Sequence, residues 1–171
     1  MLDDDPDHVE QSRQFGFRVF YGDATRLDLL HAAGADTADL LVIALDERES
    51  ITRLARTARK HFPKLRIIAR AHDMRQMFEL RDLEVEMIER ETWLAALKIG
   101  EIALAVATQD PEKAQRAARA FAEHDHVVQA KLYAVHKSAP DAHITVSNEL
   151  RDQLKRTLQE DTTEVRGKLA P

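Results

Sequence analysis

The hydrophobic and polar positions of the chain change their period about halfway along it. Through residues 1–88, apolar runs of strand length alternate with segments whose apolar residues recur every three or four positions, as in helices. The pattern predicts the end of a strand at 1–3 and four further strands at 17–21, 40–45, 65–70 and 85–88. It predicts helices at 6–15, 26–33, 51–62 and 73–80. Such alternation at short spacing favours an α/β fold with a doubly wound parallel sheet.

The apolar run from Leu40 to Leu45 has no polar position within it. A strand with this pattern is expected to be buried on both faces of a parallel sheet. Helix-ending signals flank the neighbouring segments. Gly16 and Gly34 follow two of the expected helices, and Pro63 follows a third.

From residue 90 onward the pattern becomes helical. The segment 92–107 is apolar almost all round, which indicates burial on several sides and favours a homodimer interface. Further helices are expected from Asp110 to about His136 and over 146–159. We therefore expect three parts, namely a sheet domain at 1–90, a crossover or dimerisation helix at 91–108, and a helical extension at 109–171.

Charged residues gather where the expected strands end. Asp3 and Asp46 end two strands, Asp23 lies one residue beyond another, and Arg70 ends a fourth. The carboxyl edge of a parallel sheet is where open α/β folds bind ligands. Each residue also has a purely structural interpretation. Asp3 and Asp46 suit turns or helix caps, Asp23 with Thr25 suits a cap for the helix at 26–33, and Arg70 suits an ion pair with Asp46 or Asp23.

Composition excludes several classes of function. The 171 residues carry a net charge of −5 with acids and bases interspersed, which argues against nucleic acid as a partner. Cysteine is absent, so thiol catalysis is excluded, and His124-Asp125-His126 lacks the spacing of metal ligands on one helix face. The N-terminus is acidic and no apolar run has membrane-spanning length, so a cytoplasmic location is expected.

Three local motifs, together with Ile67-Ile68-Ala69-Arg70-Ala71, resemble a known family. The motifs are Leu2-Asp3-x-Asp5-Pro6-Asp7-His8, Phe15-Gly16-x-x-Val19-Phe20-Tyr21-Gly22-Asp23-Ala24-Thr25 and Glu89-Arg90-Glu91-Thr92. They are similar to the cytosolic regulatory domain of glutathione-gated, Kef-type potassium/proton antiporters. That domain is a nucleotide-binding RCK (KTN, TrkA-N) module with a Rossmann-like fold. The similarity covers about residues 1–108.

The resemblance implies a role for each matching residue. Asp3 would bind a ribose hydroxyl, and Asp23 and Ala24, with Thr25 beside them, would border the adenine ring of AMP or NAD(H). Asp46 would line the nucleotide pocket. For Arg70, its position at a strand end itself suggests a phosphate of the nucleotide as the alternative to an ion pair. Two further matching residues concern the dimer. Arg90 would bind glutathione, since a guanidinium suits a peptide carboxylate, and Phe15 would lie at the dimer interface.

Two departures from the family pattern are visible. The family's first strand and Gly-rich loop are missing, because the similarity begins at the second strand, and the five glycines of the chain form no phosphate-binding loop. The family usually has valine where Met1 stands, so a valine codon taken as an initiator is one explanation. The second departure is Asp125, which stands where the glutathione site has an asparagine and would repel an anionic ligand.

The resemblance implies a ligand-operated regulatory domain and not an enzyme. Its partners would be a second copy, the membrane-embedded antiporter domain of the parent, glutathione and an ancillary flavodoxin-like quinone reductase, at the cytoplasmic face of the inner membrane. One alternative is a fragment of a stand-alone nicotinamide-dependent oxidoreductase, although Tyr133 is the only downstream tyrosine. Another is a truncated product that folds poorly alone.

Overall fold

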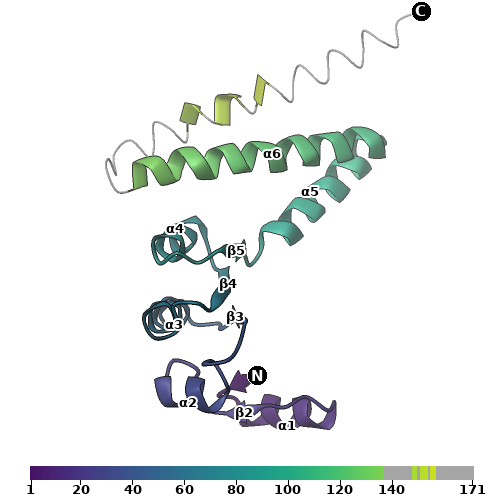
Figure 1. Ribbon diagram of the computed structural model, residues 1–171. Helices are drawn as coiled ribbons and strands as arrows, with labels where there is room; N and C mark the ends of the chain where they lie inside the picture. The colour runs from purple at the N-terminus through teal and green to yellow at the C-terminus, as the bar shows by residue number, and fades with distance from the viewer. Residues whose placement is uncertain (137–147, 150, 154, 157–171) are drawn as a thin grey trace, which may run out of the picture. The chain divides into compact units, whose positions relative to one another are not determined.

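A computed structural model describes residues 1–136, 148–149, 151–153 and 155–156, and it divides the chain into two compact units, Met1–Glu91 and Thr92–Pro171. In the first unit, strands and helices alternate as the sequence predicts (Figure 1). The strands are β1 (Leu2–Asp3), β2 (Phe20–Tyr21), β3 (Leu40–Ile43), β4 (Arg66–Ala71) and β5 (Met87–Arg90). The helices are α1 (Pro6–Gln14), α2 (Leu27–Ala32), α3 (Arg48–His61) and α4 (Met74–Asp82). The expected α/β fold is confirmed.

The strands of the first unit form two separate parallel ladders. β1 pairs with β2, with Leu2 opposite Phe20, and β4 lies between β3 and β5 in a three-stranded sheet. Each strand is followed by a helix that returns the chain to the opposite end of the sheet, which is the connection that parallel strands require. β1 and β3 are therefore both edge strands, each with one unpaired side.

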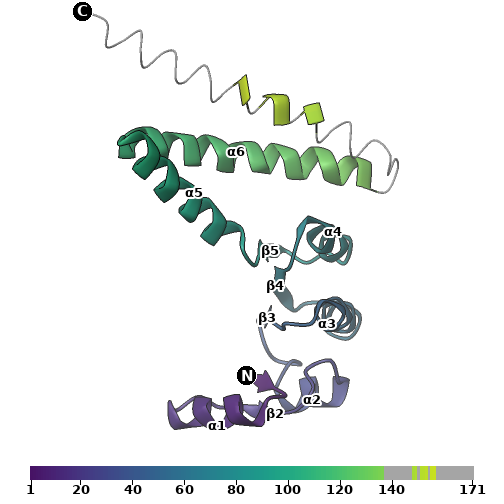
Figure 2. The ribbon, with the colours of Figure 1, turned by 180° about the vertical axis from the view of Figure 1, so that it is seen from behind.

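Helices α3 and α4 cover one face of the three-stranded sheet, and both lie on that same face in Figures 1 and 2. The apolar face of α3, including Ile51 and Leu54, packs against side chains such as Ile43, which is 1% exposed. Apolar burial of this kind contributes about 25 cal/mol for each Å² removed from water, so this layer is the main source of stability for the unit.

Gln76 is the largest polar side chain inside this layer, and it is fully buried. Its carboxamide Nε2 donates to the main-chain oxygen of Arg48 at 2.9 Å, and its Oε1 accepts from the main-chain N–H of His72 at 3.0 Å. One side chain of α4 thus joins the first turn of α3 to the residue that follows β4. Both hydrogen-bonding ends are used, as a buried amide requires.

The expectation that residues 40–45 are buried on both faces is wrong. Leu40 is 45% exposed and Val42 is 60% exposed, while Ile43 is buried and β3 ends there. The physical reason is that α3 and α4 cover only one face, and no other element of residues 1–91 covers the face that carries Leu40 and Val42. A continuous apolar run indicates that both faces of a strand can be buried. It does not show that other elements cover both faces.

Local signals place the ends of most helices correctly. Asp5 is the N-cap of α1, where its carboxylate accepts from the N–H groups of Asp7 and His8, and Pro6 occupies the first turn. Gly16 follows α1 with a φ of +84°, a left-handed conformation that favours glycine.

The predicted cap of α2 is wrong. The N-cap is Arg26, whose side chain makes no capping hydrogen bond, and α2 begins at Leu27. Asp23 instead bonds Thr25, and its main-chain oxygen accepts from the N–H of Arg26 at 3.1 Å. The acid therefore shapes the loop before the helix and leaves the helix start uncapped.

The second unit is a pair of packed helices, α5 (Trp93–Thr108) and α6 (Pro111–His136). The rings of Trp93 and Phe121 stack with their centroids 5.5 Å apart, which ties the start of α5 to the middle of α6. No residue of α5 is buried. Half of the helix expected at 146–159 falls outside the described residues. Across the described part of the chain, none of the helices is both long enough and apolar enough to cross a bilayer.

Candidate functional site

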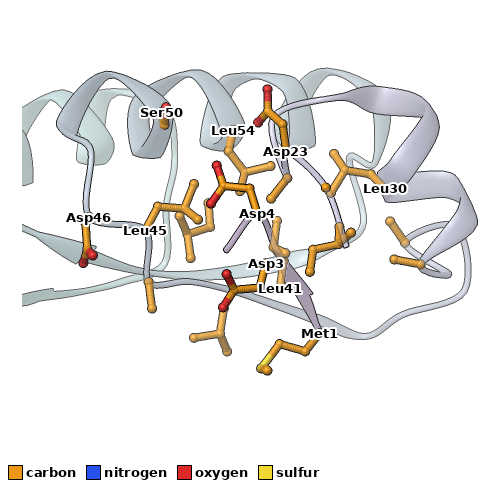
Figure 3. A pocket seen from close by; sticks show the side chains of 18 of the residues that line it. Met1, Asp3, Asp4, Asp23, Leu30, Leu41, Leu45, Asp46, Ser50 and Leu54 are labelled. Atoms are coloured by element: carbon orange, nitrogen blue, oxygen red, sulfur yellow. The ribbon is translucent and has the colours of Figure 1, made fainter. Parts of the chain in front are cut away.

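A cavity of about 860 Å³ lies in the first unit between the two ladders (Figure 3). β1 and β3 provide its opposite sides, and the loops that follow β1, β2 and β3 provide one end. α3 contributes Ser50 and Leu54, and α2 contributes Leu30. The volume is within the range of sites that hold nucleotides and other ligands of that size.

The structure brings together four of the residues that the sequence singles out. Asp3, Asp23, Ala24 and Asp46 all line this cavity. They come from the ends of three different strands, as expected for the carboxyl edge of a parallel sheet. Thr25 lies next to them and contacts Asp23.

Asp3 is held at the end of β1 by a local hydrogen bond. Its Oδ1 accepts from the N–H of Asp5 at 2.9 Å, which fixes the turn that leads into α1. The side chain is half-buried in the cavity lining, and Figure 3 shows it beside Asp4 near the middle of the site. Its structural role as a turn acid leaves the second carboxylate oxygen available to the cavity, because no hydrogen bond to Oδ2 is made within the described residues.

Asp23 is oriented by the turn that follows β2. Gly22 has a φ of +145°, which a side chain would strain, and this conformation turns the chain toward α2. The carboxylate accepts from the Thr25 hydroxyl at 2.9 Å and from the Thr25 N–H at 2.8 Å. These two bonds, the hydroxyl first, lower the pKa of Asp23, and the charges of Arg53 and Arg26 add to the effect. Asp23 is therefore an anion at neutral pH.

Asp46 belongs to a charge network that reaches away from the cavity. Its carboxylate accepts from Arg70 Nη2 at 2.5 Å, and Arg70 also donates to the main-chain oxygen of Leu45 at 2.9 Å. Arg70 Nη1 lies 3.7 Å from the carboxylate of Glu91. The ion pair of Arg70 with Asp46 is one of the two that the sequence allowed, and it directs the guanidinium to carboxylates.

His72 belongs to the same network, and its place there was not predicted from the sequence. One ring nitrogen lies 2.7 Å from the Glu91 carboxylate and the other lies 2.7 Å from the main-chain oxygen of Asp46. Glu91 is the last residue of the first unit. The loop that lines the cavity is thus joined, through Arg70 and His72, to the residue where the α/β unit ends. The only sequence signal was the position of His72 directly after a strand.

The lining is apolar apart from its acids and a few small polar groups. Its residues, all within the described part of the chain, include no lysine or arginine. A carboxylate accepts hydroxyl protons, and an apolar wall suits a planar ring, so the site is chemically suited to a nucleoside. It offers no lysine or arginine to a phosphate, and the ammonium of Met1, which is also in the lining, donates to the main-chain oxygen of Arg18 at 3.1 Å.

The residues expected at a second site do not line this cavity. Phe15 is 82% exposed after α1, and Arg90 ends β5 half-buried. Asp125, which was expected to repel an anionic ligand, is buried in α6, where its Oδ2 accepts from Gln129 at 2.6 Å. Its carboxylate is engaged inside the helix pair.

Two family models match the chain. Residues 1–91 match the TrkA-N domain, and residues 95–169 match the C-terminal domain of the potassium efflux system KefB. Among known proteins, the glutathione-regulated potassium-efflux system protein KefC of Escherichia coli and that of Escherichia fergusonii are each 47% identical over 121 residues. That alignment covers 71% of this chain and 20% of the relative, so the chain spans about a fifth of the length of these relatives.

Two solved structures are similar. The Shewanella denitrificans Kef CTD in AMP bound form has a TM-score of 0.65 and 42% identity, and the match covers 69% of this chain and 74% of that one. The TrkA-N domain of the inner membrane protein ybaL from Escherichia coli has a TM-score of 0.54 at 20% identity, over 59% of this chain and 75% of that one. The second likeness concerns the fold alone.

Proposed function

Because the chain belongs to the TrkA-N domain family, we propose that it is a nucleotide-binding regulatory domain that controls potassium efflux through a Kef-type antiporter. The sequence-based assignment to the Kef type of this domain is confirmed by the matches of both parts of the chain. In this proposal an adenine nucleotide occupies the cavity between the ladders. The observation that carries it is the convergence of Asp3, Asp23 and Asp46 on one cavity in a chain 42% identical to an AMP-bound domain.

The proposed contacts assign a part of the ligand to each wall. Asp3 accepts the ribose hydroxyls, since its Oδ1 is held by Asp5 and its other oxygen faces the cavity. Asp23 and Ala24 border the base. The phosphate meets no lysine or arginine in the lining, so the nucleoside part supplies most of the affinity, and we expect adenosine to bind about as well as AMP.

The test compares AMP, adenosine and NADH by isothermal titration and thermal shift on the 171-residue chain. The substitution Asp3→Asn keeps an oxygen for the Asp5 N–H but removes the charge. A hydrogen bond to a charged group contributes about 1.5–3 kcal/mol, so the affinity should fall roughly 10- to 100-fold. Glu10→Gln, on the exposed part of α1, is the matched control and should leave affinity unchanged. If none of the three ligands raises the melting temperature, nucleotide binding by this chain is refuted.

We propose that the network around Arg70 carries the ligand signal. A ligand beside Asp46 changes how Arg70 is shared between Asp46 and Glu91, and Glu91 is followed directly by the second unit. AMP should therefore alter hydrogen exchange at residues 91–93 in the unmodified chain and not in Arg70→Gln. The same response in both proteins would exclude this route. Coupling of this kind requires the ligand to bind two states with different affinity.

The apolar surface of α5 is proposed to form a homodimer interface. Ile99 is 68% exposed and Val106 is 74% exposed, which is unusual for large apolar side chains on one helix. Ile99→Glu should shift the chain toward monomer in sedimentation or light scattering, and Lys98→Gln on the same turn, which changes the net charge by the same amount, is the control for charge. A monomeric unmodified chain at all concentrations would argue against this interface.

The remaining parts of the proposal concern the whole antiporter. We propose that the domain lies at the cytoplasmic face of the inner membrane and that a second, anionic ligand such as glutathione binds near Arg90 and Phe15. No hydride transfer is proposed, so NADH should remain unoxidised when incubated with the chain and candidate substrates. Turnover of NADH would instead favour the oxidoreductase alternative.

A further inference from the structure

The ring of His72 lies between two hydrogen-bond acceptors that come from different loops. Its Nδ1 lies 2.7 Å from the carboxylate of Glu91, and its Nε2 lies 2.7 Å from the main-chain oxygen of Asp46. The main chain at this point is anchored, because the N–H of His72 donates to Oε1 of the buried Gln76 at 3.0 Å. The ring therefore joins the loop after β3 to the residue after β5.

These two contacts together require a ring with two protons. A carboxylate ion and a main-chain carbonyl only accept hydrogen bonds, so each ring nitrogen must carry a proton to bond its partner. Neutral imidazole has one N–H, whereas imidazolium has two. With a neutral ring, one nitrogen lone pair would face an oxygen lone pair at 2.7 Å, which is repulsive. The full set of contacts is thus specific to the charged form of His72.

The charges around the ring also favour the imidazolium. The charged groups that face this network from the loop after β3, from β4, from the starts of α3 and α4 and from the end of β5 are Asp46, Glu47, Arg48, Arg70, Asp73, Glu89 and Glu91. Arg90 lies on the other side of β5, since side chains alternate along a strand. Arg48 and Asp73 neutralise each other, and Arg70 offsets only part of the remaining negative charge. A charge on the ring reduces that excess.

We propose that His72 is a proton-operated latch between the loop that lines the cavity and the end of the α/β unit. Histidine changes its charge between about pH 5 and pH 8. The imidazolium holds Asp46 and Glu91 together. When the pH rises, the proton on Nε2 passes to solvent, to which the side chain is 28% exposed. The remaining N–H stays on the Glu91 carboxylate, because an ionised acceptor binds more strongly than a carbonyl, and the Asp46 carbonyl is released.

The latch makes the proton an input that is separate from the ligand. Leu45 and Asp46 both line the cavity and are labelled in Figure 3, so opening the latch frees one part of the cavity wall. Glu91 is followed directly by the second unit. The use of this input in controlling potassium efflux rests on the proposed function, whereas the latch itself needs neither a nucleotide nor an antiporter.

The test records NMR spectra of the 171-residue chain without ligand from about pH 6 to about pH 8.5, a range that covers the titration of histidine. At the acidic end, nitrogen-15 spectra should show both ring nitrogens of His72 protonated. As the pH rises, the signal of the Asp46 carbonyl carbon should move upfield together with the change in the ring, which is the sign of a lost hydrogen bond. His61→Gln, at the exposed end of α3, is the matched control and should leave this movement unchanged.

Two variants separate a proton-operated latch from a contact that only packs the loop. His72→Gln removes the titrating group, so the Asp46 signal should no longer move with pH. Glu91→Gln supplies an amide N–H, so a neutral His72 can accept from that amide and still donate to Asp46. The Asp46 hydrogen bond should then persist at the alkaline end and its signal should stay constant. If His72→Gln does not fold, the ring spectra of the unmodified chain and Glu91→Gln still decide the question.

The latch is refuted by any one of three results. The first is a His72 ring that carries a single proton at the acidic end. The second is an Asp46 signal that stays constant over the whole range in the unmodified chain. The third is the same movement of that signal in His72→Gln or Glu91→Gln as in the unmodified chain. None of these measurements contains a nucleotide, so the latch and the nucleotide site fail separately.

Discussion

Replacing Gly22 with alanine should destabilise the first unit more than the same replacement at Gly34. Gly22 has a φ of +145°, and a Cβ built there would lie 2.5 Å from Cδ1 of Leu29. Gly34 also has a positive φ, +93°, but a Cβ at Gly34 would meet no atom within 4 Å. The two positions therefore share backbone strain and differ in the contact with Leu29.

The magnitude follows from these two terms. A side chain held in such a backbone conformation costs about 1–2 kcal/mol at either position. At Gly22 the end of the Leu29 side chain must also rotate away, which costs about 0.5–1.5 kcal/mol more. Gly22→Ala should thus lose roughly 1.5–3.5 kcal/mol of a typical total of about 5–15 kcal/mol. Gly34→Ala should lose about 1–2 kcal/mol.

The assay is urea unfolding followed by circular dichroism, with amide exchange by mass spectrometry to locate the effect. Exchange should increase in residues 1–91 and remain unchanged in α5 and α6. In a Leu29→Ala background the contact is gone, so Gly22→Ala should cost about 0.5–1.5 kcal/mol less than in the unmodified chain. Equal costs at Gly22 and Gly34 in both backgrounds would refute the reasoning.

Three further predictions concern single contacts. Gln76→Leu removes the buried amide that joins α3, β4 and α4, and it leaves the main-chain N–H of His72 without an acceptor. The substitution should cost about 1–3 kcal/mol in urea unfolding, and a cost near zero would contradict these hydrogen bonds. The hydrogen bond from Arg48 lowers the pKa of Asp73 below its usual 3.8, and the N–H of Gln76, which Asp73 caps, lowers it further. The stabilisation by this carboxylate is therefore complete above about pH 4 and is lost as the pH falls through the folded-state pKa. Asp73→Asn should therefore flatten the acid decline in stability, and an unchanged profile between pH 5 and pH 2 would count against it. Phe121→Ala removes the stack on Trp93, which is worth about 0.5–1.5 kcal/mol, and should shift tryptophan emission to longer wavelength; unchanged emission would show that the rings do not stack in solution.

Much of the first unit was predictable because its signals are local. The alternation of apolar runs, the Asp5-Pro6 start of α1 and the positions of Asp3 and Asp46 at strand ends depend on neighbours along the chain. Parallel strands then bring those acids to one edge, as general topology requires. The lining of the cavity by Asp3, Asp23 and Asp46 follows from that step.

Sequence reasoning fell short at Val42 and Arg70, where distant segments decide the outcome, and at Asp23, where the adjacent turn decides it. The exposed face of Val42 depends on whether another element covers it, and a run of apolar residues contains no record of that. The hydrogen bonds of Asp23 depend on the turn at Gly22, which directs the carboxylate to Thr25 and away from α2. The pairing of Arg70 with Asp46 joins residues 24 positions apart, so sequence reasoning named it only as one of two options.

The separation of the two ladders also has a consequence for how the unit opens. No main-chain ladder joins β1–β2 to β3–β5, so apart from the connecting segment 33–39 the two halves are held together by side-chain packing. Local unfolding energies in proteins follow such boundaries. The segment from β1 through α2 should therefore form a less stable cooperative unit, which opens while α3, α4 and their sheet remain folded. Within the first unit, limited proteolysis should cut residues 1–39 before residues 40–91.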